Sequence, residues 1–302
     1  VLEKILAGFG DDLPVSAFSI DGTFPTGTSQ FEKSGIADFI PVWDDENLCT
    51  QCNKCVAICP HAAIRSKVVT NDELTKFPGT LKSVPAIGRP FAKENESYIL
   101  QVSPEDCTGC DLCVVVCPAI SKEKENFKAI NMHRKIEVDV EENVNWDHFV
   151  SLPYYDRTAL QITNVKGSQF LEPLFEFSGA CSGCGETPYI KMITQLYGDS
   201  MLIANATGCS SIYGGNLPTT PYKTNEFGRG PAWANSLFED NAEFGLGLKL
   251  GLSKKQEIAV DLLKSLESVV GSELVAAILN NPEDTEALKN EKFAQIDALN
   301  KI

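Results

Sequence analysis

The chain has 302 residues, of which 43% are hydrophobic and 22% are charged, and its formal net charge is −15. This length is enough for two domains with sizeable cores, and the acidic balance argues against a nucleic-acid or anionic-membrane partner. No apolar run has the length of a membrane span, and no secretory signal sequence is present. The 11 cysteines are clustered, which is typical of a reducing, cytoplasmic compartment where thiolates bind metals.

The N-terminal 40 residues are predicted to be a connecting segment. A short apolar helix is expected over residues 1–9, followed by a loop-rich stretch with a turn signal at Asp21-Gly22. The chain begins with Val1, and its last residue, Ile302, ends a helical pattern. We therefore expect the chain to be a segment of a longer protein.

Two cysteine runs with the same spacing dominate the chemistry. Residues 49–60 and 107–118 each contain Cys-x2-Cys-x2-Cys-x3-Cys-Pro, the bacterial ferredoxin run whose fourth cysteine ligates the neighbouring cluster. They predict a ferredoxin-like α+β domain over residues 41–135 with two [4Fe-4S] clusters. Structural zinc usually takes two separated ligand pairs, so zinc is the weaker reading, as are disulfides. The crossed ligation predicts Cys49, Cys52, Cys55 and Cys117 for cluster 1, and Cys107, Cys110, Cys113 and Cys59 for cluster 2.

The stretches around these runs carry less chemistry. The insert between the runs is predicted to be an exposed loop, with a turn at Pro78-Gly79, that leads into a strand over residues 97–102. His61 is expected to be partly exposed and not a ligand, because eight cysteines already saturate two clusters. Residues 136–172 are predicted to be a connector, and the charged run from Glu137 to Glu142 to be a solvated face.

A second informative region begins at residue 173. Thr187 and Pro188 are able to start a helix that runs through Tyr197. Residues 200–204 then read as a buried strand that ends in a Gly-rich turn. The carboxyl ends of such strands are where α/β sheets bind ligands, so a crevice is expected there.

Three cysteines, Cys181, Cys184 and Cys209, are expected around this crevice. An all-cysteine [4Fe-4S] cluster takes four ligands, one more than this region offers. Three readings therefore stay open: a cluster whose fourth ligand is missing from this segment, zinc with a non-cysteine partner, or three cysteines that are merely buried.

The last part, residues 251–302, is predicted to be helical. Apolar residues recur at spacings of three and four from Ile258 to Val270, on one face of a helix that Gly271 interrupts. A final helix is expected from about Asn281, with its apolar residues inward. These faces are predicted to be core or docking surfaces.

These residues resemble the pyruvate:ferredoxin (flavodoxin) oxidoreductases of the large single-chain type, over nearly the whole chain. The run from Ser178 to Tyr189, followed by the run from Ala204 to Asn216, is highly specific for that family. The other stretches that carry the resemblance are the two ferredoxin runs and residues 12–18, 21–26, 101–107, 129–132 and 228–245.

The resemblance implies an enzyme that oxidatively decarboxylates pyruvate with coenzyme A to acetyl-CoA and CO2, using thiamine diphosphate. Its electrons would pass through a proximal [4Fe-4S] cluster and the two ferredoxin-type clusters to ferredoxin or flavodoxin. It further implies that Cys181, Cys184 and Cys209 are proximal-cluster ligands, and that Glu186 and Cys209 line the thiamine diphosphate site. Residues 173–302 would then be part of an α/β thiamine-diphosphate-binding domain, in an intact enzyme that is a homodimer and binds Mg. No catalytic side chain is predicted in this chain.

The sequence departs from the family in three respects. It contains no Gly-Asp-Gly, the family motif for magnesium and the diphosphate, and no twelfth cysteine; Phe31-Glu-Lys-Ser34 also stands where the family has Tyr-Glu-Lys-Arg. We therefore expect the segment alone to be inactive in pyruvate turnover. The alternative is a stand-alone two-[4Fe-4S] electron carrier with an appended binding domain, against which the third group of cysteines argues. Lys54, Lys67 and Lys93 are candidates for a basic patch where an acidic carrier docks.

Overall fold

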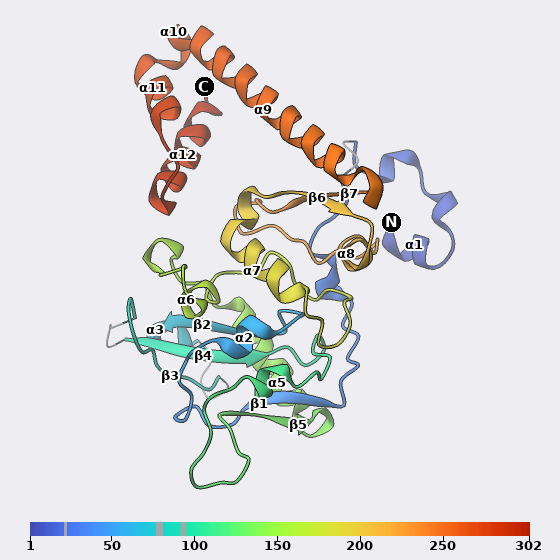
Figure 1. Cartoon of the computed structure of the whole chain (residues 1–302), viewed down its shortest axis with the longest axis vertical. Coiled ribbons are helices and arrows are strands. Elements are labelled where there is room, and N and C mark those ends of the chain that lie inside the picture. Colours follow the sequence, from blue (N-terminus) through green and yellow to red (C-terminus); the bar gives the residue numbers. More distant parts are fainter. Residues whose placement is uncertain (21–22, 77–80, 92–94) are drawn as a thin grey trace.

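The computed structural model describes residues 1–20, 23–76, 81–91 and 95–302. The expected turns at Asp21-Gly22 and Pro78-Gly79, and Lys93, lie outside these residues. Figure 1 shows a lower part with strands β1 to β5, a middle part with α7, α8, β6 and β7, and an arm of helices α9 to α12.

Strands and helices are mixed along the chain up to residue 236, and only helices follow. The strands are β1 (Phe39–Trp43), β2 (Ile64–Thr70), β3 (Val84–Pro85), β4 (Glu96–Val102), β5 (Ile130–Arg134), β6 (Leu202–Ala206) and β7 (Ala232–Ser236). The helices are α1 (Leu2–Leu6), α2 (Lys54–Ile58), α3 (Asn71–Leu74), α4 (Leu112–Val115), α5 (Lys135–Ser151), α6 (Val165–Ser168), α7 (Thr187–Tyr197), α8 (Cys209–Gly214), α9 (Asn241–Ser265), α10 (Glu267–Val270), α11 (Ser272–Asn280) and α12 (Glu286–Leu299).

The lower part is built from two copies of one unit, strand–cysteine run–short helix–strand. The first copy is β1, α2 and β2, and the second is β4, α4 and β5. The copies pair crosswise: β1 is antiparallel to β5, and β2 is antiparallel to β4. This exchange brings the end of each cysteine run beside the start of the other, which confirms the ferredoxin-like α+β fold predicted for this part.

A core of aromatic and aliphatic side chains lies under the cysteine runs. Tyr98 is fully buried, and its ring meets Trp43 edge-to-face with ring centroids 5.7 Å apart. The Tyr98 hydroxyl donates to Asn53 Oδ1 at 2.9 Å, so the one polar atom of this side chain is satisfied. Cys49, Cys55, Cys59 and Cys117 all pack against this core. The core therefore fixes the cysteines by burial and not by the loops alone.

The strand expected over residues 97–102 is confirmed as β4, which is buried along its whole length. The expected connector instead contains a 17-residue helix, α5. Trp146 and Phe149 of this helix are buried against the sheet. The expectation that the charged run ending at Glu142 is a solvated face is wrong for Glu142 itself, because the inward face of α5 carries it into contact with Gln101.

The middle part contains the predicted helix as α7, with the expected bounds. The predicted strand is present as β6, paired in parallel with β7. It is not buried as expected: Leu202 is 45% exposed, and the rest of the strand is half-buried. A sheet of two described strands offers too little neighbouring surface to cover both faces of β6.

The helical arm has a small core of its own. Leu263, Val275 and Ile278 are buried together, and Ile296 and Leu299 of α12 pack against them. The described residues include no helix that combines the length and apolar composition needed to cross a bilayer.

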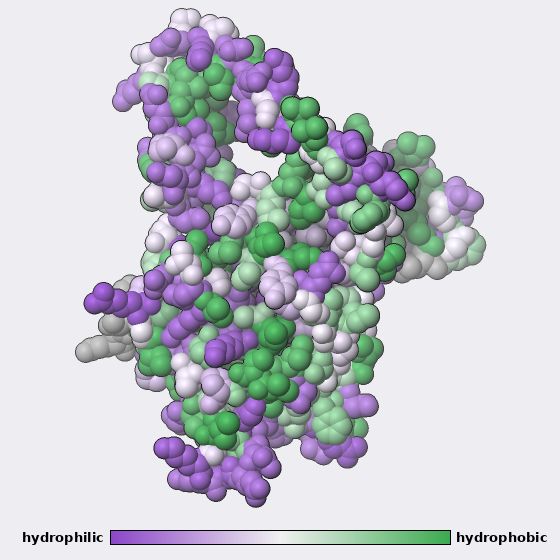
Figure 2. Space-filling view, viewed as in Figure 1, coloured by the Kyte–Doolittle hydropathy of each residue, from purple (hydrophilic) through white to green (hydrophobic). Residues whose placement is uncertain are grey.

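The outward face of the arm is more apolar than the sequence pattern predicts. Gly271 separates α10 from α11, as expected. Of the predicted apolar stripe, Leu263 is buried, but Ile258, Leu262 and Val269 are exposed. The stripe is therefore only partly core. Figure 2 shows apolar side chains reaching the surface of this arm.

Candidate metal centres

The two cysteine runs adopt the same backbone conformation. Gln51 and Asn53 in the first run have φ of 52° and 57°, and Gly109 and Asp111 in the second have φ of 68° and 64°. These left-handed turns aim backbone N–H groups at sulfur: the N–H of residue 51 donates to Cys49 Sγ, and that of residue 109 donates to Cys107 Sγ, both at 3.4 Å. Such N–H to sulfur bonds stabilise the thiolate form that binds iron.

Residues outside the runs hold these turns in place. Gln51 is a costly residue at positive φ, but its buried amide donates to the Pro85 carbonyl at 2.8 Å and accepts from the Ile87 N–H at 3.0 Å. At Gly109, a side chain would bring its Cβ within 3.0 Å of the Phe39 carbonyl oxygen. The second turn therefore needs glycine, and the first is anchored by the insert.

The eight cysteines of the two runs surround two separate cavities. Each cavity is lined by three cysteines of one run and the last cysteine of the other. Cys49, Cys52, Cys55 and Cys117 line one cavity. Cys107, Cys110, Cys113 and Cys59 line the other. This division follows the crosswise pairing of the strands and supports the predicted crossed ligand sets.

Burial in the cavities makes uncompensated thiolates costly. Burial raises the pKa of the Cys107 thiol to about 12, and the neighbouring thiols of its set act in the same direction. Burial likewise raises the pKa of Cys55 and Cys113 far above the ordinary value. Thiols in such surroundings ionise only when a positive partner compensates them, as iron does. The sulfur-only donor sets fit [4Fe-4S] clusters.

The turn that contains Cys181 and Cys184, the third cysteine turn, lies against the second cysteine run, residues 107–118. The Cys184 N–H donates to the Cys181 carbonyl at 3.0 Å, which closes a tight turn. Within this turn, Ser182 Oγ donates to the Thr108 carbonyl at 3.2 Å, and a Cβ built on Gly183 would lie 3.7 Å from Cys110 Cβ. The turn is therefore adjacent to the set formed by Cys107, Cys110, Cys113 and Cys59.

His61 joins the same two regions. It is 3% exposed, so the expectation of a partly exposed histidine is wrong. Its Nδ1 is 3.0 Å from the Ser178 carbonyl, and its own carbonyl accepts from the Phe177 N–H at 2.8 Å. Burial lowers the pKa of His61, which favours the neutral ring. It fixes the third cysteine turn to the first run.

The three cysteines predicted for the third site are more exposed than those of the other two sets. Cys181 and Cys209 are exposed, and Cys184 is half-buried. Across the described chain, no three His, Cys, Asp or Glu side chains converge as ligands of a single metal ion. Cys209 is the first residue of α8, which follows β6 in the chain.

Glu186 lies near the same helix. Tyr213 of α8 is buried, and its pKa is raised by burial and then by the carboxylate of Glu186, with a further contribution from Cys184. Glu186 and Cys184 therefore lie near Tyr213, in the last turn of α8. The structure brings these residues into one neighbourhood but leaves Glu186 itself exposed.

Buried cations are the functional candidates that the sequence pattern misses. Lys67, predicted as part of a surface patch, is 1% exposed, and its Nζ donates to the carbonyls of Phe149 and Leu152 at the end of α5. It cannot contribute to a docking surface. Lys191 of α7 is buried in the same way beside α2. In the sequence, the one indication that Lys191 is buried is its spacing of four residues from Thr187, which places both on the same face of α7. The structure shows that this face is turned inward.

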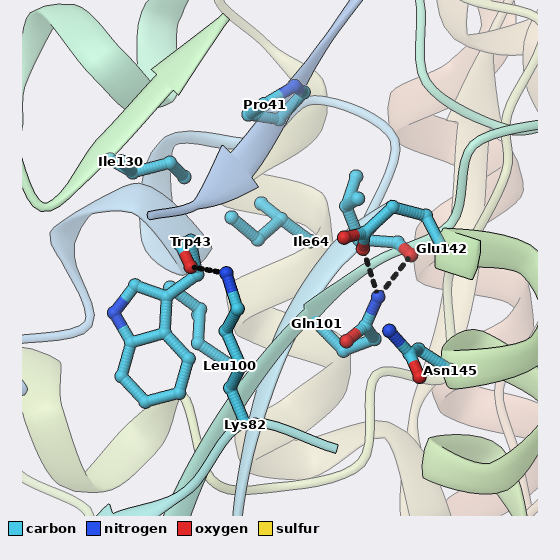
Figure 3. A pocket seen from close by; sticks show the side chains of 10 residues that line it. Pro41, Trp43, Ile64, Lys82, Leu100, Gln101, Ile130, Glu142 and Asn145 are labelled. Atoms are coloured by element: carbon cyan, nitrogen blue, oxygen red, sulfur yellow. Dashed lines mark hydrogen bonds between the residues drawn. The ribbon is translucent and has the colours of Figure 1, made fainter. Parts of the chain in front are cut away.

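A further cavity, drawn in Figure 3, contains no cysteine. It lies between the sheet and α5, where Gln101 donates to the Glu142 carboxylate at 2.5 Å and Lys82 Nζ donates to the Trp43 carbonyl at 2.8 Å. The Glu142 carboxylate and the Lys82 ammonium are thus paired, whereas the buried Oδ1 of Asn145, which also lines this cavity, has no hydrogen-bond partner among the described residues.

Fold and sites together define an iron–sulfur protein with a two-cluster ferredoxin-like part. In keeping with this, residues 48–120 match a family described as a 4Fe-4S dicluster domain. Residues 1–37 match the EKR family, described as a domain of unknown function.

Relatives of the whole chain extend this class to a particular family. The chain is 56% identical over 299 residues to the pyruvate-flavodoxin oxidoreductase of Nostoc sp., which covers 99% of this chain and 25% of that protein. It is 53% identical over 296 residues to a probable pyruvate-flavodoxin oxidoreductase of Escherichia coli, covering 98% and 25%. It is 51% identical over 278 residues to the pyruvate:ferredoxin oxidoreductase of Moorella thermoacetica, covering 92% and 23%. The chain thus matches one segment of these oxidoreductases and spans about a quarter of their length, which confirms the predicted resemblance.

Proposed function

We propose that this chain is the electron-relay segment of a pyruvate:ferredoxin or pyruvate:flavodoxin oxidoreductase. The parent enzyme would convert pyruvate and coenzyme A to acetyl-CoA and CO2, with ferredoxin or flavodoxin as the electron acceptor. The observation that carries the proposal is the division of eight cysteines, none of them exposed, into two sets of four around separate cavities. The names of relatives that match nearly the whole chain support the parent reaction.

For the two clusters, the side chains supply thiolate ligands and exclude water. Cys49, Cys52, Cys55 and Cys117 would hold one, and Cys59, Cys107, Cys110 and Cys113 would hold the other. When bound, each cluster takes up and gives back single electrons. The N–H groups that donate to Cys49 and Cys107 stabilise negative charge on the sulfurs. The apolar core beneath the cysteines limits solvent access. Both effects help to set the reduction potential of a cluster.

The third group of cysteines supports a proximal site in the second region. Cys181, Cys184 and Cys209 would be three of its four ligands, and residues 173–302 part of a thiamine-diphosphate-binding domain. That cofactor supplies carbanion chemistry when bound. Glu186 would hydrogen-bond it, while the magnesium and diphosphate contacts belong to the remaining domains, because this sequence contains no Gly-Asp-Gly.

The arrangement of the cysteine turns suggests an order for the relay. Because Ser182 and Gly183 touch the second run, the set that includes Cys107 and Cys110 would be the middle site. The set that includes Cys49 and Cys52 would then be the outer one, and exposed Lys54 lies in its run. The working assembly would be cytoplasmic and homodimeric, built from residues 1–40, 41–135, 136–172 and 173–302 together with the other domains.

Iron and sulfide analysis with EPR of the anaerobically purified, dithionite-reduced chain tests the proposal. We expect about eight irons per chain and the coupled signals of two neighbouring [4Fe-4S] clusters. About twelve irons would mean that Cys181, Cys184 and Cys209 find a fourth ligand within this chain. Zinc in place of iron would overturn the proposed function.

A further inference from the structure

Lys191 is a buried cation at the contact between the third cysteine turn and the first cysteine run. It lies on α7, which begins three residues after Cys184, and it is 1% exposed. Its Nζ donates to three backbone carbonyls, those of Val56, of Ala57 at 3.2 Å and of Cys59 at 3.3 Å. These carbonyls lie at the end of α2, the helix that carries Cys55.

Three carbonyl acceptors favour the protonated form of this side chain, and they oppose burial, which lowers the pKa of Lys191 to about 8. A lysine ammonium has three N–H donors and no acceptor, whereas a neutral amine would bring a lone pair against one of the carbonyls. The end of α2 also carries the negative end of the helix dipole, which favours a cation. The geometry therefore fits a positively charged Lys191 in the protein interior.

Among the described residues, this charge has no carboxylate partner. No ion pair of Lys191 occurs among the residues that the structure describes, and the charged groups that act on it are Cys59, Arg65 and Cys55. A buried cation without a counter-charge is costly. The anionic partners that the fold offers are the two cysteine sets, one through Cys55 and the other through Cys59.

We propose that Lys191 is a positioning residue whose buried positive charge raises the reduction potentials of the two ferredoxin-type clusters, and most of all that of the cluster bound by Cys59. The inference rests on the proposed function, because it requires both clusters to be present. Reduction adds negative charge to a cluster, and a cation in a poorly screened interior stabilises that charge. The effect is larger at Cys59 because the ammonium bonds to the carbonyl of that residue, whereas no direct bond to Cys55 is present.

The chain contains a matched control for this charge. Lys67 is equally buried, and its ammonium also donates to three carbonyls at a helix end, those of Phe149, Val150 and Leu152. The charged groups that act on it are Arg65, Glu172, Lys223 and Glu73, with no cysteine among them. Lys67→Met therefore removes a buried ammonium with the same bonds but without the neighbouring sulfurs.

The test is an EPR-monitored redox titration of the intact oxidoreductase and its variants, with iron content measured on the same samples. In Lys191→Met, we expect the reduced-to-oxidised ratio of the Cys59 cluster at a fixed solution potential to fall about tenfold, equal to about 59 mV for a one-electron couple. A smaller fall is expected for the other cluster, and Lys67→Met should leave both ratios unchanged. Unchanged ratios in a fully loaded Lys191→Met, or equal shifts in the two variants, would overturn the inference.

A second pair of variants covers the case in which Lys191→Met loses iron. Lys191→Arg and Lys191→Gln both keep a hydrogen-bond donor and differ in charge, so we expect the lower ratio in Lys191→Gln alone. Equal ratios would show that the charge has no part. Wild-type protein without [4Fe-4S] clusters would contradict the proposed function, whereas a loaded wild type with insensitive variants would contradict this inference alone.

Discussion

The ferredoxin-like part and the region after residue 200 differ in how deeply their cysteines are buried. In the first, four cysteines pack on a core that contains the fully buried Tyr98, and the strands β2 and β4 are buried nearly throughout. In the second, Cys209 is exposed, and β6 and β7 are at most half-buried. Within α9, Leu263 is the one buried residue.

This difference in burial shows what holds the ligands of each site in place. A site whose ligands are held by a packed core keeps its geometry without help, because any movement of a sulfur disturbs many contacts. A site on half-buried strands needs further surface to become fixed. We therefore expect the first two sets to bind clusters in this chain, and the third to depend on the remaining domains.

The largest effect is expected from the cluster ligands. Because the sets cross between runs, Cys55→Ser should abolish one cluster and Cys59→Ser the other, each with a loss of about four irons. Cys209→Ser is the matched change in the region after residue 200. It should leave the iron content of this chain unchanged. EPR of reduced samples identifies which signal is lost. Loss of the same cluster in both Cys55→Ser and Cys59→Ser would refute the crossed assignment.

The next effect concerns the buried ion pair that joins the ferredoxin-like part to the segment leading into the third cysteine turn. Arg65 of β2 donates to Glu176, and both side chains are nearly inaccessible. Glu176→Ala should lower the free energy of unfolding by about 3–5 kcal/mol, because it leaves Arg65 charged, buried and unpaired. The exposed pair of Lys254 and Glu257 is the control, and Glu257→Ala should cost less than about 1 kcal/mol. Denaturant unfolding measures both, and equal costs would mean that the junction is not a rigid contact.

A smaller effect is expected for Glu186, which lies within residues 173–302. In the intact enzyme, Glu186→Gln should weaken thiamine diphosphate binding about tenfold or more, since hydrogen bonds to charged groups contribute about 1.5–3 kcal/mol. Cluster content should not change. Glu239→Gln, at another exposed carboxylate of this region, is the control. Cofactor titration monitored by activity recovery gives the affinity, and an unchanged value would remove Glu186 from the site.

The smallest effect is a pH dependence at Glu142. Burial raises the pKa of Glu142, although Gln101 and Lys82 act to lower it, and Glu141 and Asp44 act to raise it. The folded state then holds its proton more tightly than the unfolded state, so this stabilisation is present below the ordinary pKa of about 4.3 and is lost as pH rises through the raised value.

Glu142→Gln keeps a neutral side chain at every pH. Relative to wild type, it should gain on the order of 1 kcal/mol of stability as pH rises from 5 to 8. Glu137→Gln, at an exposed carboxylate of the same helix that is not among the groups acting on Glu142, is the control. Denaturant midpoints at several pH values measure the difference, and parallel curves for wild type and Glu142→Gln would contradict the raised pKa.

The sequence by itself determined the parts that depend on local spacing. The cysteine runs, the strand before the second run, and the helix that starts at Thr187 could all be predicted, because turn residues and ligand spacing act over a few positions. The resemblance to the oxidoreductases rests on such stretches too. The half-buried state of β6 could not be predicted, because it depends on which surfaces meet it.

Only the tertiary structure decided which polar residues are inside. Lys67 and Glu142 were read as surface charges, His61 as partly exposed, and Lys191 gave almost no signal, yet all four are buried. Each is held by groups far away in the sequence, such as the carbonyls at the end of α2 that receive Lys191. A single buried charge is stabilised by partners that long-range packing supplies, and spacing along the chain does not encode those partners.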